Sequence, residues 1–166
     1  MDWLPFDLHP EYPPEGLPRE LLLARYREAG IDRVRRMFEA NGLVYNPHPE
    51  VVPNTMEALR VTELARDREL HRAMHDRLMD AYWTEARNIG DPKELKVLAT
   101  EAGLDAAEVD DVLAGDAYFD RVRASTAEAQ SIGITGIPAF ALGGRLLILG
   151  AQPREVFEQA YARLAE

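Results

Sequence analysis

The sequence contains no cysteine, which excludes disulfide bonds, thiolate metal sites and cysteine nucleophiles within these 166 residues. It also lacks a long apolar run, since the longest aliphatic stretch near its end is Leu146–Leu149, far short of the roughly 18–20 residues of a membrane span. Basic residues number 19 against 29 acidic ones, and a net charge of −10 disfavours contact with nucleic-acid phosphates. We therefore expect a soluble protein with neither a nucleic-acid nor a membrane partner.

The N-terminal residues do not resemble a secretory signal. Asp2 and Asp7 stand where a signal peptide carries basic residues ahead of an apolar run. The sequence therefore predicts a cytoplasmic location, with which the lack of cysteine agrees. The chain has the length of one domain, and 46% hydrophobic against 29% charged residues suffice for a substantial core.

Apolar periodicity predicts few strands and many helices. Leu4, Phe6 and Leu8 alternate as in a short strand, and Pro5 would place that strand at a sheet edge. Near the other end, residues 139–142 and 145–149 flank Gly143-Gly144 and predict a hairpin with a type I′ turn. Helices are expected over 19–29 and 31–41, from Thr55 to about Glu85 with interruptions, after Asp91 and Asp105, over 119–129, and from Gln152 onward.

Three acidic or amide residues mark helix starts. Asn54, Asp91 and Asp105 each precede a Glu by three residues, the spacing of a capping box. Two histidines, His71 and His75, lie one helical turn apart and could hold a metal. No third ligand accompanies them, so we expect no metal site and interpret both as a solvated flank of a helix.

The chain resembles a known family through several short motifs taken together. The motifs are Gly133–Phe140, Gly144-Arg145, Gly150–Phe157, Trp3–Gly16, Pro53–Thr55 and Arg87–Asp91. They resemble the DsbA-like thioredoxin-fold family, in particular its FrnE-like branch, whose members exchange dithiols and disulfides. The resemblance implies an α/β thioredoxin-like fold, with residues 1–17 and 131–166 as a partial core and residues 18–130 as a large helical insertion.

The resemblance also implies a binding site. Pro138 would be the family's cis proline, Ile137 the residue whose backbone pairs with substrate, and Gly136 its neighbour in the loop. Asn54 could line the same pocket, as in related glutathione-dependent isomerases, or could act only as a helix cap. The family's first β-α unit, with its Cys-x-x-Cys motif, has no counterpart in this sequence, so no catalytic residue is assigned.

Three functions remain open on these residues. The first is a member of the oxidoreductase family that is redox-inactive as this cysteine-free chain, with a thiol or peptide substrate. The second is a glutathione-dependent isomerase of similar fold, and the third is a non-catalytic peptide-binding or oligomeric domain. Because a missing central strand leaves strand edges unpaired, we also expect a homodimer that buries Trp3 or Phe6.

Overall fold

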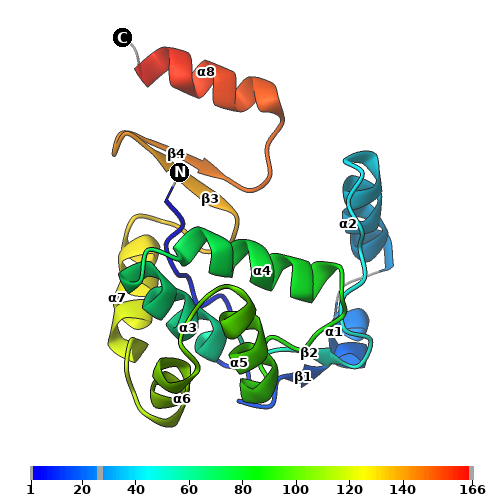
Figure 1. Ribbon diagram of the computed structural model, residues 1–166. Helices are drawn as coiled ribbons and strands as arrows, with labels where there is room; N and C mark the ends of the chain where they lie inside the picture. The colour runs from blue at the N-terminus through cyan, green and yellow to red at the C-terminus, as the bar shows by residue number, and fades with distance from the viewer. Residues whose placement is uncertain (1, 26–27, 165–166) are drawn as a thin grey trace.

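The computed structural model describes residues 2–25 and 28–164, and the described chain is mostly helical with few strands (Figure 1). In chain order the elements are β1 (Leu17–Pro18), α1 (Arg19–Arg25), α2 (Glu28–Ala40), β2 (Val51–Val52), α3 (Met56–Asp67), α4 (His71–Trp83), α5 (Pro92–Glu101), α6 (Ala106–Ala114), α7 (Phe119–Ser131), β3 (Ala139–Leu142), β4 (Leu146–Leu149) and α8 (Arg154–Leu164). None of the described helices is both long and apolar enough to cross a membrane.

Helices α3 to α7 form a bundle around α3, which is buried on most of its circumference. Its Val61 and Ala65 are fully buried and meet equally buried side chains from α4 and α5, among them Met74, Leu95 and Leu98. The large hydrophobic cluster runs from Ala58 to Val112, so the main core lies in the helical part of the chain. Helix α4 buries Met74 and Leu78 in this core, and α5 buries Leu95 and Leu98.

Two of the three predicted helix caps form. The Asp91 side chain accepts a hydrogen bond from the Lys93 N–H, and Asp105 accepts from the N–H groups of Ala107 and Glu108. Each cap satisfies donors that the first turn of a helix cannot pair internally. Asn54 stands one residue before the assigned N-cap, Thr55, yet its side-chain oxygen accepts a hydrogen bond from the N–H of Met56, the first residue of α3, while the Glu57 carboxylate binds Arg60.

The C-terminal hairpin and α8 form a separate layer above the bundle (Figure 1). The predicted hairpin forms: Gly143 and Gly144 both have positive φ, and the Arg145 N–H donates to the Leu142 carbonyl, but three residues rather than two connect the strands. The second strand begins at Leu146 rather than Arg145 because Leu142 pairs with Leu146. Phe140 meets Phe157 edge to face, with ring centroids 4.9 Å apart, and this contact helps hold α8 on one face of the hairpin.

The N-terminal segment is not the strand that its alternation predicts. Residues 4–8 run extended beside α3 and α7 without a strand partner, and side chains bind their backbone instead. The Ser125 hydroxyl donates to the Pro5 carbonyl, and the Asp7 N–H donates to Thr126 Oγ1 at 2.9 Å. A β-strand needs a neighbouring strand for its backbone groups, and hydroxyls of α7 take that place here.

Two further expectations differ from the structure. Gly30 lies inside α2 rather than between two helices, while Tyr26 and Arg27 of the predicted helix 19–29 are outside the described residues. Strands β1 and β2, of two residues each, pair as a small antiparallel sheet with Leu17 opposite Val52, where the sequence predicts no strand. This small sheet packs against α1, a few residues before α3 begins.

Candidate functional site

The loop between α7 and β3 presents the residues that the sequence singles out. Ile134 is buried, and its N–H donates to the Ala129 carbonyl, so α7 closes firmly before the loop begins. Gly133 has a φ of +90°, which glycine adopts without strain and which turns the chain away from the helix axis. Beyond this anchor Ile137 is 56% exposed and Pro138 is also exposed.

The Ile137-Pro138 peptide bond is cis, as predicted. Gly136, Ile137 and Pro138 thus lie together at the start of β3, and the Pro138 carbonyl accepts a hydrogen bond from the Gly150 N–H at 2.8 Å. In antiparallel pairs the backbone groups of alternate residues face the partner strand. The backbone N–H and C=O groups of Phe140 and Leu142 therefore face β4.

The same alternation leaves one edge of β3 open. Ala139 and Ala141 direct their N–H and C=O groups away from β4, and β3 pairs with no other strand among the described residues. The backbone of Ile137 likewise makes no hydrogen bond to another described residue. The result is a row of unpaired donors and acceptors that begins at the loop and continues along the strand.

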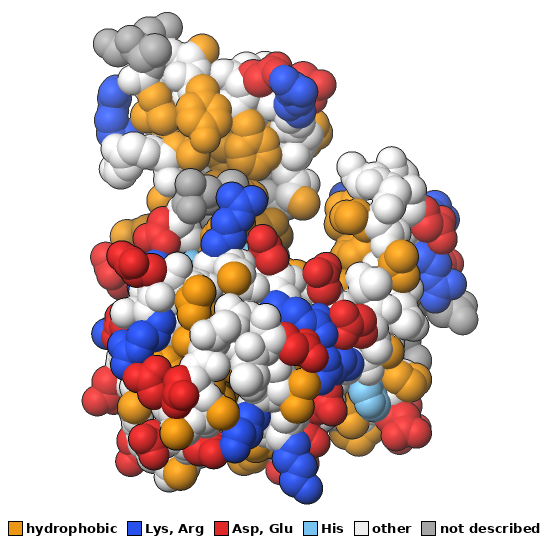
Figure 2. Space-filling view, in the orientation of Figure 1, with side chains coloured by type: hydrophobic (Ala, Val, Ile, Leu, Met, Phe, Trp, Pro, Cys, Tyr) orange, Lys and Arg blue, Asp and Glu red, His pale blue; other side chains and the backbone are white. Residues whose placement is uncertain are grey.

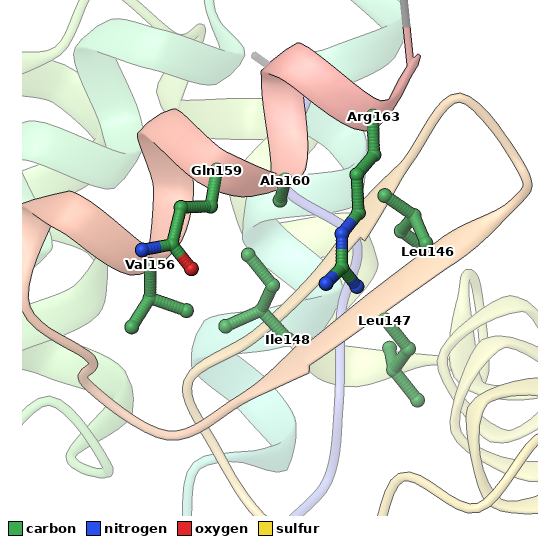
Figure 3. A pocket seen from close by; sticks show the side chains of 7 residues that line it. All are labelled: Leu146, Leu147, Ile148, Val156, Gln159, Ala160 and Arg163. Carbon is green, nitrogen blue, oxygen red and sulfur yellow. The ribbon is translucent and has the colours of Figure 1, made fainter. Parts of the chain in front are cut away.

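Helix α8 covers one face of the hairpin and leaves the other face exposed. On one face α8 packs over Ile148, and a shallow groove of about 190 Å³ opens between β4 and α8. Figure 3 shows Leu146 and Ile148 on the side of β4 that faces α8, while Leu147 points away from it. The groove is lined by Leu146, Leu147, Ile148, Val156, Gln159, Ala160 and Arg163.

The opposite face of the hairpin is apolar and exposed. It carries Ala139 and Ala141 of β3 beside Leu149 and Leu147 of β4, which are 48% and 38% exposed. Figure 2 shows apolar side chains gathered over α8 and the hairpin, whereas charges of both signs cover the helical bundle. An extended segment lying along the open edge would find apolar surface beside it.

The structure does not bring Asn54 to this loop. Its side-chain N–H₂ donates to the Tyr12 carbonyl at 2.7 Å, and its oxygen accepts from the Met56 N–H at 2.9 Å. The backbone carbonyl oxygen of Asn54 lies against Gly90, shortly before α5 begins. The Asn54 amide therefore links the segment before β1 to the start of α3.

His71 and His75 lie on one face of α4, as their spacing predicts, and both are partly exposed. The Trp3 indole stacks on His75 with ring centroids 4.4 Å apart. His71 Nε2 lies 2.9 Å from a guanidinium nitrogen of Arg66. Within the described part of the chain, no three histidine, aspartate or glutamate side chains come together as metal ligands would.

Two buried acids escaped the sequence analysis. Glu63, on α3, is only 2% exposed and pairs with Arg66 and Arg121 at 3.1 and 3.5 Å. Asp7 is 5% exposed, and burial raises the pKa of its carboxyl, although a backbone hydrogen bond from His9 opposes the shift. Asp7 lies between Phe6 and Leu8, which is a sequence signal for burial, whereas Glu63 follows Thr62 and carries no such signal.

The buried Asp7 carboxyl predicts a specific pH dependence. Because its folded-state pKa is raised, its contribution to stability is fully present below the pKa of an unfolded aspartate and is lost as the pH rises through the folded value. We expect Asp7→Asn to raise the free energy of unfolding at neutral pH, by an amount that shrinks as the pH falls. Urea denaturation at several pH values measures this, with the exposed Asp116→Asn as control. A D7N protein less stable than the parent at neutral pH would contradict the prediction.

The described residues form a mostly helical protein with a C-terminal hairpin that a cis-proline loop precedes, and comparison with known proteins identifies its family. Residues 1–162 match the model of the DSBA-like thioredoxin domain, and the chain belongs to that family. It is 30% identical over 162 residues to the uncharacterized protein YwbO of Bacillus subtilis (strain 168), covering 96% of this chain and 80% of that protein.

A solved structure supports the same assignment. The probable DsbA oxidoreductase SCO1869 from Streptomyces coelicolor superposes with a TM-score of 0.87 at 34% sequence identity. The match covers 95% of this chain and 72% of that one, so the relative contains residues with no counterpart here. This chain is thus a cysteine-free member of a family named for thiol oxidoreductases.

Proposed function

We propose that this chain binds extended polypeptide segments along the open edge of β3 and does not itself exchange disulfides. One observation carries the proposal: the exposed Ile137 leads with unpaired backbone groups into a strand edge that no described strand occupies. An added strand would pair with the N–H and C=O groups of Ala139 and Ala141. Its alternate side chains would lie beside Ala139 and Ala141, the cross-strand neighbours that β3 offers at this edge.

The lack of cysteine supports the second half of the proposal. Thiol–disulfide exchange proceeds by attack of a thiolate on a disulfide sulfur, and the sequence supplies no thiol. The loop with its cis proline can nevertheless hold a peptide, because strand addition uses backbone hydrogen bonds rather than sulfur chemistry. The binding half of the family's activity is therefore separable from its chemistry in this chain.

A substitution on β3 tests the binding directly. Ala141→Pro removes an N–H that faces the open edge, not one that pairs with β4, and proline is tolerated at such edge positions. The probe is fluorescently labelled insulin B chain with its cysteines carboxymethylated, which excludes thiol chemistry. We expect A141P to bind it about tenfold more weakly than the parent, from one lost hydrogen bond and the bulk of the proline ring.

Two controls separate the edge from general damage to the hairpin. Ala141→Ser keeps the N–H and should bind like the parent, whereas Leu147→Pro alters the opposite edge, on β4. Equal binding by A141P and the parent would overturn the proposal. Turnover in an insulin-reduction assay would overturn the second part of the proposal, that the chain does not itself exchange disulfides.

A second copy of this chain that paired through β3 would compete for the same edge, which is a different contact from the predicted homodimer that buries Trp3 or Phe6. Light scattering measures the oligomeric state of the parent and of A141P. If the parent is a dimer that A141P separates into monomers and that the peptide does not affect, the edge is occupied by a second copy of the chain rather than by a peptide. Calorimetric binding of glutathione that is lost in an Ile137 or Asn54 variant would favour the isomerase instead. A monomer that binds the peptide and not glutathione supports the proposal.

A further inference from the structure

Arg66 binds both Asp2 and Trp3 at the start of the described chain. Residues 2–8 form an extended strap, and at its upper end Arg66 of α3 binds Asp2 at 2.6 Å and donates to the Trp3 carbonyl. The same guanidinium group lies 2.9 Å from His71 Nε2. Arg66 therefore holds the strap and His71 at once.

The contact with His71 depends on the protonation of the imidazole. A guanidinium group has only donors, so His71 Nε2 must be the unprotonated, accepting nitrogen. A proton on that nitrogen would remove the acceptor and place two positive charges at hydrogen-bond distance. Arg66 and a protonated His71 thus exclude each other in this arrangement.

The surrounding charges do not relieve the conflict. The strap presents Asp2, α3 presents Glu63, and α7 presents Arg121 and Glu128 along a groove of about 450 Å³ that also reaches Arg66. On α4 itself, Arg72 pairs with Asp76, and His75 stacks on Trp3. Asp2 and Glu63 are bound to Arg66, and no carboxylate of the described residues forms an ion pair with His71. Burial and the charge of Arg66 lower the pKa of His71, against the weaker opposing pull of Glu63 and Asp2.

We propose that His71 is a pH-sensitive latch: when neutral it keeps Arg66 on the strap, and when protonated it displaces Arg66 and frees Asp2 and Trp3. The lower end of the strap stays in place because Ser125 and Thr126 hold it through hydroxyl groups, which do not titrate in this range. The released upper end uncovers the groove between α3 and α7. This latch stands independently of peptide binding at β3.

The direction of the pH effect follows from both histidines. Burial also lowers the pKa of His75, whose ring lies against Trp3, with Asp76 opposing the shift. A histidine whose folded-state pKa is lowered stabilises the closed strap above the pH where unfolded histidine titrates, about pH 6.5. The closed state is lost as the pH falls below that point. The equilibrium constant between the closed and the released strap changes by about tenfold for each unit by which the pKa is lowered.

The exposure of Trp3 reports the state of the latch. In a Trp83→Phe background Trp3 is the only tryptophan, and acrylamide quenching measures its contact with solvent. We expect quenching to increase severalfold between about pH 8 and about pH 5, through the titration of His71, while far-UV circular dichroism stays constant. Constant quenching across this range would overturn the proposal.

Variants of His71 and His75 separate the latch from the stacking contact. His71→Gln keeps an oxygen that can accept from Arg66 but cannot take up a proton, so Trp3 should stay shielded at both pH values. His71→Lys carries a permanent positive charge and should leave Trp3 exposed at both. His75→Gln should retain the pH response. An H71Q protein that opens in acid like the parent would show that His71 is not the latch.

Discussion

Replacing Arg60 with alanine should destabilise the protein by about 3–5 kcal/mol, the range seen when one partner of a buried charged network is removed. The Arg60 side chain is 4% exposed and binds Glu57 through two hydrogen bonds of 2.9 and 2.7 Å. It also donates to the carbonyls of Val112, Gly115 and Ala117. These carbonyls lie at and beyond the C-terminal end of α6, where a helix lacks partners of its own.

The loss falls on groups that water cannot reach easily. With Arg60 gone, the carbonyls lose their donors and Glu57 loses its cation, so the connection from α6 to α7 is left without its main polar contacts. Thermal unfolding should show a drop in midpoint on the order of 10 °C. The control is Arg72→Ala, whose side chain is 83% exposed on the next helix and should change little. An R60A protein as stable as R72A would contradict the assignment.

Leu98→Ala should destabilise the protein by about 2–5 kcal/mol, because it removes buried methyl groups and leaves a cavity that the bundle fills only in part. Leu98 is fully buried at the centre of the cluster that joins α3, α4, α5 and α6. Its neighbour Val97 is 47% exposed on the same helix, so Val97→Ala is a matched control with an expected effect within about 0.5 kcal/mol. Urea denaturation of the two variants measures the difference in the free energy of unfolding, and equal midpoints would show that α5 does not bury the face that carries Leu98.

Local chemistry explains which parts of the fold the sequence predicts. Asp91 and Asp105 cap their helices, and Gly143-Gly144 turns the hairpin, because each of these depends on a few adjacent residues. The strand expected over residues 4–8 fails for the opposite reason, since a strand depends on a distant partner that alternation cannot reveal. The sequence also predicts the loop at Ile137-Pro138, but through resemblance to a family rather than through periodicity.

Buried charge is the part of the site that sequence reasoning misses. Arg60 and Glu63 sit among Ala58, Val61 and Ala65 on a helix that is covered on nearly every side. Charged residues are usually exposed, and their burial here depends on partners from α6 and α7 that lie far away in sequence. The contact between His71 and the strap depends in the same way on Arg66, five residues before it, and on residues at the start of the chain.

The hairpin and α8 share little of the main hydrophobic cluster, whose members all come from the helical bundle. Their own buried residues are few, chiefly Ile148 and Ala160. Such a division makes sub-global unfolding the expected behaviour: the C-terminal unit opens while the bundle persists as a separate foldon. A peptide that added a strand to β3 would then couple its association to the ordering of that unit. The free energy needed to order the C-terminal unit would lower the observed affinity, and binding would show the negative heat-capacity change of coupled folding.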